Sequence, residues 1–138
     1  MRYIGFDLGT KTLGIALSDS LGIIASYYKT IEFKEEDYES LIEPIKKIIT
    51  ENKINTAVLG LPKNMNNSIG YAGERSLNFK KLLEEKLNLN VILEDERLSS
   101  VEANNIMIAS DVSRSKRKKK VDALAATIIL QRYLDRKD

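Results

Sequence analysis

The first fourteen residues constrain the fold of this chain most, because two apolar runs follow one another across a single short turn. The first run extends from Ile4 to Leu8 and the second from Leu13 to Leu17, with Gly9 to Lys11 between them. This pattern predicts a β-hairpin at the start of the chain. The first strand contains one acid, Asp7, and a buried carboxylate without a partner costs free energy. Asp7 therefore indicates a metal ion, a basic partner or a substrate cation, unless it only accepts hydrogen bonds from the turn that follows.

The composition narrows the chemistry that the chain can perform. Its 138 residues suffice for one domain, which we expect to span residues 1–138. The chain contains no cysteine and no histidine, which excludes thiolate catalysis, Ser-His catalysis and zinc sites of the usual kind. Any chemistry must therefore use carboxylates, lysines, hydroxyls, backbone groups and hard cations. No apolar stretch is long enough to span a membrane, and the strand-like start predicts no signal peptide, so we expect a cytoplasmic protein.

The rest of the chain alternates between strand and helix patterns. In chain order, these predict a strand at Ile23–Phe33, a helix with a capping box at Ser40 and Glu43, a strand at Thr56–Leu61, a helix at Ala72–Leu87, a strand at Asn90–Glu96, a helix from Ser99 to about Ala109, and a helix from about Val121 to Arg136 that buries Leu124, Ala125, Ile128 and Ile129. This order predicts an α/β domain with a five-stranded mixed sheet. The first three strands should be antiparallel neighbours, and the last two should lie parallel to the first.

Three acids are expected to meet at one edge of this sheet. Ligands gather at the carboxyl ends of parallel strands, where Asp7 and Glu96 lie, and Asp122 follows in the first turn of the final helix. Three converging carboxylates repel one another unless divalent cations lie between them. Two Mg²⁺ or Mn²⁺ ions about 4 Å apart would stabilise the attacking and leaving oxygens of phosphodiester hydrolysis. Two alternatives stay open, because Asp122 also suits a helix start and Asp95 competes with Glu96 from the opposite face.

Basic residues are concentrated immediately before Asp122. The segment 114–120 carries six cations and no acid, and we expect the stretch Ser110 to Lys120 to be mobile. Such a run is either solvated surface or a patch for an anionic partner, to which phosphate contacts give affinity without reading sequence. The expected nucleic-acid-binding residues here are Arg114, Lys116, Arg117, Lys118, Lys119 and Lys120.

Other residues near the predicted sheet edge are weaker candidates for substrate contacts. Lys11 lies in the first turn, where Gly9 leaves room for a phosphate. Arg97 could contact a phosphate or pair with Asp95. The long polar loop after Leu61 is either solvated or borders the substrate through Lys63, Asn64 and Asn66.

Four motifs occur in order across nearly the whole chain. They read Ile4-Gly5-Phe6-Asp7-Leu8-Gly9-Thr10, Gly60-Leu61-Pro62, Asp95-Glu96-Arg97-Leu98-Ser99-Ser100 and Asp122-Ala123-Leu124-Ala125-Ala126. Together they resemble the YqgF/RuvX family of bacterial pre-16S rRNA nucleases, which have an RNase H-like fold. The family pattern has Thr-Thr where this chain has Ser99-Ser100, which keeps both hydroxyls.

The resemblance implies a fold and a function. The fold is a three-layer arrangement in which helices flank the sheet. The function is that of a metal-dependent nuclease, a hydrolase whose acidic triad matches Asp7, Glu96 and Asp122. Its substrate would be structured RNA, and its role would be to process the 5′ end of precursor 16S rRNA in ribosome biogenesis. Precursor rRNA and ribosomal particles would be its partners.

Three other functions compete with this one. The hairpin around Asp7 also resembles the phosphate-binding hairpin of the actin and sugar-kinase group, but one domain of this length cannot form their ATP cleft between two domains. A Holliday junction resolvase acting on branched DNA would use a similar acidic cluster in a homodimer, so monomer and homodimer both stay open. A non-catalytic RNA- or ribosome-binding factor needs cations, whereas three acids would repel phosphate without metal.

Overall fold

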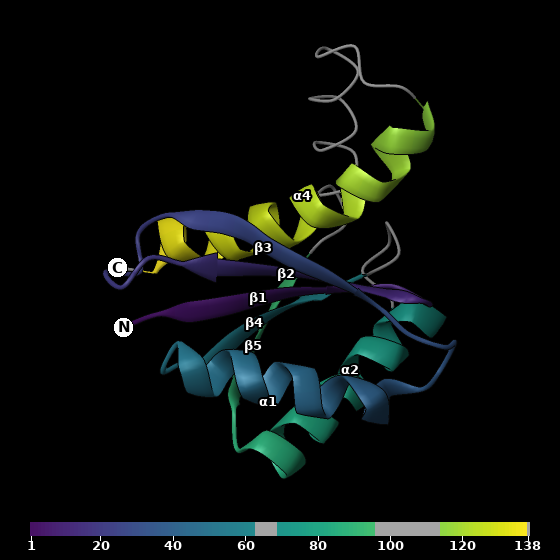
Figure 1. Cartoon of the computed structure of the whole chain (residues 1–138), viewed down its shortest axis with the longest axis horizontal. Coiled ribbons are helices and arrows are strands. Elements are labelled where there is room, and N and C mark those ends of the chain that lie inside the picture. Colours follow the sequence, from purple (N-terminus) through teal and green to yellow (C-terminus); the bar gives the residue numbers. More distant parts are fainter. Residues whose placement is uncertain (63–68, 96–113, 138) are drawn as a thin grey trace.

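A computed structural model describes residues 1–62, 69–95 and 114–137, and for residues 114–123 it describes only the course of the backbone. Within these ranges, the strands form one sheet in the order β3-β2-β1-β4-β5 (Figure 1). Their bounds are β1 Tyr3–Leu8, β2 Thr12–Ser18, β3 Ala25–Glu32, β4 Thr56–Leu61 and β5 Asn90–Asp95. β1, β2 and β3 pair antiparallel, whereas β4 is parallel to β1 and β5 is parallel to β4. The predicted five-stranded mixed sheet is confirmed, with β1 at its centre.

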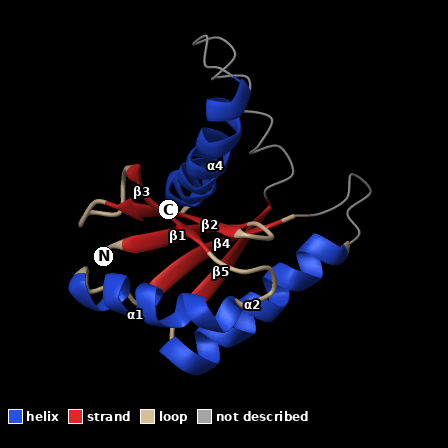
Figure 2. Ribbon diagram, turned by 45° about the vertical axis from the view of Figure 1, so that its right-hand side comes forward, coloured by secondary structure: helices blue, strands red, loops and turns tan. Residues whose placement is uncertain are grey.

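Helices cover both faces of this sheet. α1 (Ile42–Glu51) and α2 (Tyr71–Leu87) lie on one face, and α4 (Arg114–Arg136) lies on the other (Figure 2). A short 3-10 helix, η1 (Tyr38–Leu41), leads directly into α1. This is the three-layer arrangement that the family resemblance implied. The helix predicted from Ser99 to about Ala109 lies outside the described residues. No helix in the described part of the chain combines the length and the apolar character that crossing a membrane requires.

Two apolar clusters hold the layers together, because successive strand residues point to opposite faces. On the α1/α2 face, Phe6 meets Phe79 of α2 edge to face, with ring centroids 6.1 Å apart. The buried residues of this cluster are mostly large, and include Ile4, Phe6, Leu8, Leu13, Ile15, Leu41, Ile45, Leu59, Phe79, Leu83 and Val91. The cluster on the α4 face is smaller and consists of Tyr3, Ala16, Ala25, Val58, Ala126, Ile129, Leu130 and Leu134.

α4 lies directly on the central strand because residue 5 is glycine. A Cβ atom at Gly5 would lie 2.7 Å from the Leu130 Cβ and 3.2 Å from the Ala126 carbonyl oxygen. Near the start of β1, the rings of Tyr3 and Tyr133 meet edge to face with centroids 5.6 Å apart. α4 therefore runs antiparallel to β1, and its N-terminal part points toward the end of β1.

The structure corrects the sequence predictions at two helix starts. α4 begins at Arg114, so the basic residues 114–120, which were expected to be mobile, continue the helix. Lysine and arginine favour helices, and neither glycine nor proline interrupts this run. The capping box predicted at Ser40 is wrong, since α1 has no side-chain cap bond and the Ser40 hydroxyl donates to the Asp37 carbonyl at 2.7 Å. η1 precedes α1 without a break, so a helical turn stands where a side-chain cap was expected.

Two smaller differences concern a strand start and the buried side of α4. β3 begins at Ala25 because Ile23 and Ile24 belong to the preceding turn, where their N–H groups donate to the Asp19 carboxylate at 2.7 and 3.0 Å. In α4, Ala125 and Ile129 are buried as predicted. Leu124 and Ile128 are only half-buried, and Ala126, Leu130 and Leu134 complete the buried stripe in their place.

Candidate functional site

Asp7 lies near the carboxyl end of the central strand, on the face that α4 covers. Alternation along β1 sets this direction, because Tyr3 and Gly5 both contact α4. Its side chain is half-buried, between an antiparallel neighbour, β2, and a parallel neighbour, β4. The carboxylate thus stands at a sheet end of the kind where ligands bind in α/β folds.

Glycines flank Asp7 on both neighbouring strands. Gly14 of β2 is its Cα partner. On the other side Phe6 pairs with Leu59, so the next step of this parallel register places Gly60 of β4 beside Asp7. Neither glycine has a side chain, so the two adjacent strands place no side chain beside the Asp7 carboxylate. Sequence reasoning missed this feature because it depends on the register between strands.

Residue 122 lies about one helical turn before the point where α4 contacts β1. Asp122 precedes Ala126, which contacts Gly5, by four residues, or about 6 Å along the axis. Asp7 follows Gly5 by two strand residues, or about 6.6 Å. Because the helix and the strand are antiparallel, both steps lead in the same direction. Residue 122 and Asp7 therefore both lie beyond this contact, in the direction of the carboxyl end of β1.

The acids of β5 point to different faces of the sheet. Asp95 pairs with Leu61, which continues the alternation of Leu59 in the α1/α2 cluster, so Asp95 faces away from Asp7. Glu94 pairs with Gly60 and lies on the Asp7 face, where Arg136 of α4 forms an ion pair with it. The strand geometry thus opposes Asp95 as the rival of Glu96. Outside the described residues lie Glu96, Arg97, Lys63, Asn64 and Asn66.

Positions of predicted nucleic-acid contacts lie at the Asp7 end of the sheet. Lys11 is exposed in the turn between β1 and β2, which is closed by the Gly9 N–H donating to the Thr12 carbonyl at 2.8 Å. The Lys11 carbonyl also accepts the N–H of Phe33 at 2.9 Å, which ties this turn to the end of β3. The basic residues 114–120 form the first turns of α4, which rise away from the sheet in Figure 1.

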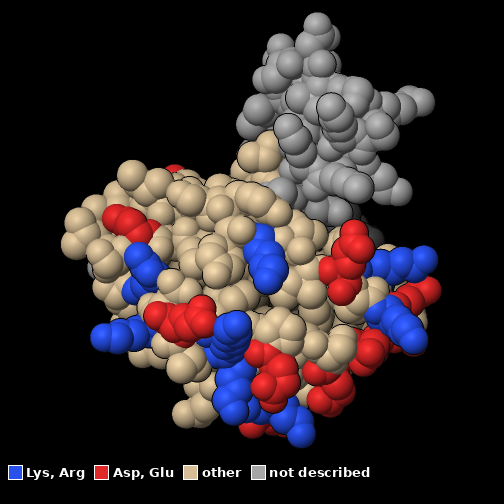
Figure 3. Space-filling model, in the orientation of Figure 1, with Lys and Arg blue, Asp and Glu red and all other residues tan. Residues whose placement is uncertain are grey.

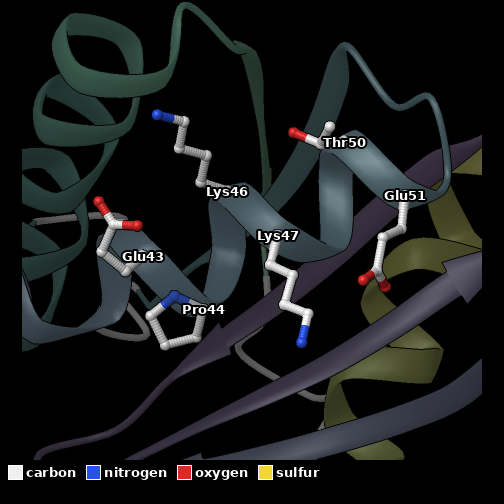
Figure 4. Close-up of a pocket in the computed structure, with 6 residues that line it drawn as sticks. All are labelled: Glu43, Pro44, Lys46, Lys47, Thr50 and Glu51. Carbon is white, nitrogen blue, oxygen red and sulfur yellow. The ribbon is translucent and has the colours of Figure 1, made fainter.

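Charges on the α1 side of the molecule are arranged differently. Lys, Arg, Asp and Glu side chains are interspersed over the lower half of the view in Figure 3, where α1 lies. A shallow depression of about 650 Å³ occurs here, and all of its lining residues belong to α1 (Figure 4). They are Glu43, Pro44, Lys46, Lys47, Thr50 and Glu51. This depression is separated from Asp7 by the sheet, and charges of both signs at helical spacing are typical of a solvated helix face.

The donor atoms available to the site suit a hard divalent cation. With no histidine or cysteine in the chain, the ligands must be oxygens, which Mg²⁺ and Mn²⁺ prefer. Among the residues whose side chains are described, no three carboxylates converge on one point. Asp7 is the one predicted ligand within that set, and its half-buried carboxylate between two glycines fits the role.

Comparisons with known proteins place the chain within one family. The family model described as "RuvX: Holliday junction resolvase" matches residues 1–136. A protein of Geobacillus sp. (strain WCH70) is 50% identical over 137 residues, which cover 99% of each chain. A protein of Clostridium kluyveri is 51% identical over 136 residues, covering 99% of this chain and 98% of the other. Both relatives carry the name "Putative pre-16S rRNA nuclease".

Solved structures with low sequence identity have the same fold. RuvC of Thermus thermophilus, bound to a Holliday junction substrate, superposes with a TM-score of 0.56 at 14% identity, covering 97% of this chain and 93% of that one. The fowlpox virus Holliday junction resolvase gives a TM-score of 0.56 at 17% identity, covering 98% and 99%. At such identities the likeness establishes the RNase H-like fold and no more.

Proposed function

Because the chain belongs to the RuvX family, we propose that it is a cytoplasmic nuclease that hydrolyses phosphodiester bonds in structured RNA. The name shared by its relatives supports precursor 16S rRNA as the substrate, with 5′-end processing in ribosome biogenesis as the role. One observation supports the chemistry. Asp7 stands at the carboxyl end of the central strand, between Gly14 and Gly60 of the neighbouring strands, where α/β folds bind their ligands.

Asp7, Glu96 and Asp122 would hold Mg²⁺ or Mn²⁺, and two ions suit phosphodiester hydrolysis. Such ions activate water and stabilise the charge that develops on the attacking and leaving oxygens. Asp7 contributes a carboxylate whose backbone is fixed, because β1 pairs with strands on both sides. Little reorganisation is then needed when the cation binds, which is the condition for strong electrostatic stabilisation.

The basic segment of α4 and the turn containing Lys11 would hold the RNA backbone. Both lie at the end of the sheet where Asp7 is found. Contacts of this type neutralise phosphates and release counterions, so they supply affinity that falls with salt. They carry no sequence information, and structured RNA would be selected through its shape.

Branched DNA is the second candidate substrate. The description of the matching family model and the fold shared with two resolvases favour it. A junction resolvase needs two sites on opposed strands, and therefore a homodimer. The oligomeric state in solution and a four-way junction as substrate distinguish this reading from the first.

The test of the proposed function compares three proteins on two substrates. Wild type, Asp7→Asn and Asp19→Asn are incubated with a precursor 16S rRNA 5′ fragment or a four-way DNA junction, in Mg²⁺, Mn²⁺ or a chelator. Asp19→Asn is the matched control, because it removes one charge from the turn between β2 and β3. We expect metal-dependent RNA cleavage by wild type and control. The cleavage rate of Asp7→Asn should fall by more than about 100-fold. Even changes to residues that only hydrogen-bond to a metal ligand lower metal affinity or activity by about 10- to 100-fold.

Other outcomes discriminate between the alternatives. Equal cleavage by all three proteins would indicate a contaminating nuclease or a different site. Preferential cleavage of the junction by a dimer would favour the resolvase. Tight RNA binding without cleavage by any of the three proteins would favour a non-catalytic binding factor.

A further inference from the structure

We propose that Gln131 is a positioning residue, whose side-chain amide fixes α4 along the sheet and so sets residue 122 against Asp7. The inference rests on the proposed function only for the role of residue 122. Its structural part concerns how a helix is held in register, and it stands on hydrogen bonds between described residues.

The Gln131 amide binds the chain that leads into β3 in two directions. Its Nε2 donates to the Ile23 carbonyl at 2.9 Å, and its Oε1 accepts the N–H of Ala25 at 2.8 Å. Nε2 also donates to the Asp135 Oδ1 at 2.9 Å, one turn along the same helix. The side chain therefore uses its acceptor and both of its donor hydrogens. It pairs with the start of β3 as a peptide group of a neighbouring strand would. This pairing fixes both the position of the Gln131 side chain along the strand and its orientation.

The apolar contacts of α4 with β1 and β2 combine small residues with large ones such as Tyr3 and Leu130, and apolar contacts are not directional. Where α4 crosses them, β1 and β2 contribute Gly5 and Ala16, and the helix itself contributes Ala126. Small residues permit close approach, but they offer few of the ridges and grooves that stop one helix position from replacing another. Hydrogen bonds depend on distance and angle, so the Gln131 amide adds a restraint that the apolar cluster lacks.

The first turns of α4 amplify any error in this restraint. Gln131 lies nine residues after Asp122, or about 13.5 Å along the helix axis. Residues 114–122 extend from the held part of the helix toward the Asp7 end of the sheet. A small rotation at Gln131 therefore displaces residue 122 by more than it displaces Leu130. A misplacement of about 1 Å at a reacting centre can cost about 100-fold in rate.

The test compares Gln131→Met with Leu134→Ala in the full-length chain. Gln131→Met keeps the side-chain length and removes all three hydrogen bonds. Leu134→Ala is the matched control on the same helix, since Leu134 is only 6% exposed and its truncation weakens packing without touching the amide. Melting temperature, Mn²⁺ affinity by calorimetry, and kcat and KM on the precursor rRNA fragment are measured for both.

We expect Gln131→Met to lower kcat by at least 10-fold and Mn²⁺ affinity several-fold, with little change in KM. Leu134→Ala should lower the melting temperature more and leave kcat and Mn²⁺ affinity of the folded protein near wild type. Losses in kcat that follow the melting temperature in both variants would overturn the inference. So would unchanged Mn²⁺ affinity and kcat in Gln131→Met.

A distance measurement separates this inference from the proposed function. The chain has no cysteine, so Lys46→Cys on α1 and Lys118→Cys on α4 provide two unique spin-label sites. Gln131→Met should shift or broaden the distance between the labels, and Leu134→Ala should not. If the wild-type protein neither binds Mn²⁺ nor cleaves RNA but Gln131→Met still shifts the distance between the labels, the proposed function is refuted and the positioning role is retained. An unchanged distance would refute the positioning role.

Discussion

The two faces of the sheet are built from different residues for different tasks. On the α1/α2 face, large side chains such as Phe6, Phe79 and Leu83 fill the space between sheet and helices. On the α4 face, Gly5, Ala16 and Ala126 let the helix lie close to the strands, and polar side chains restrain its flanks. The first arrangement gains stability from buried area. The second fixes the position of α4 relative to the strands, and Asp7 lies on that face.

Phe79→Ala should produce the largest effect on stability, because it removes a large side chain from the α1/α2 face. The ring is 1% exposed and packs against Phe6. Its loss leaves a cavity and should cost about 3–5 kcal/mol in the free energy of unfolding, measured with urea. Leu82→Ala, at a half-buried site on the same helix, is the control and should cost less. Molecules that stay folded should keep their Mn²⁺ affinity, and a selective loss of that affinity would contradict the division of tasks.

Gly5→Ala tests the α4 face. The new Cβ would lie 2.7 Å from the Leu130 Cβ, so the helix must move away from β1. We expect a cost of about 1–3 kcal/mol in stability and a fall in cleavage rate of more than about 10-fold. Val58→Ala removes volume from the same cluster without pushing the helix outward. If both variants lose activity in proportion to stability, close approach has no special role.

Arg136→Gln tests the ion pair that joins α4 to β5. Glu94 is 12% exposed in its side chain and pairs with Arg136, which is 59% exposed. Solvent screening at Arg136 limits the expected cost to about 1 kcal/mol. A double-mutant cycle with Glu94→Gln in urea isolates the pair from other effects. A coupling energy near zero would mean that the pair does not help to hold the helix.

The smallest effect is expected at Asp19, outside both faces. The N–H groups of Ile24 and Ile23 donate to its carboxylate and hold its pKa below the ordinary value of 3.8. The folded state therefore favours the ionised form, and this contribution to stability is present above the unfolded pKa. It is lost as pH falls through the folded pKa. Carboxyl titration by NMR gives the folded pKa, and Asp19→Asn should remove this part of the acid dependence. A titration midpoint above 3.8 would contradict the assignment.

The sheet was predictable from sequence, and the register that assembles the site was not. Apolar runs identified most of the strands, and residues typical of strands identified β3. The order of the elements along the chain predicted a mixed sheet. The pairing of Asp7 with Gly14, and the position of Gly60 beside it, depend on how strands align. Likewise, no periodic pattern identifies Gln131, because its partners lie more than a hundred residues away.

The helix predictions failed where local signals compete with their surroundings. Ser40 and Glu43 have the spacing of a capping box, but η1 occupies the turn before α1. The run 114–120 is so basic that a mobile segment was expected, although its residues favour helices and α4 includes them. For the proposed acids, sequence identified residue types at plausible strand and helix ends. The face on which Asp7 lies could be assigned only once strand pairing and the contact of Gly5 with α4 were known.

The contact between Gly5 and Leu130 joins two segments that are made at different times during synthesis. The hairpin of β1 and β2 emerges first and can pair at once, but the helix that covers its Asp7 face is made last. Until then Tyr3 and Ala16 lack their partners, and contacts so distant in sequence form slowly. A chain interrupted before α4 would expose this surface and be prone to aggregation. If the acids act as proposed, a growing or truncated chain without α4 has no assembled site, so hydrolytic activity begins only once α4 has been made.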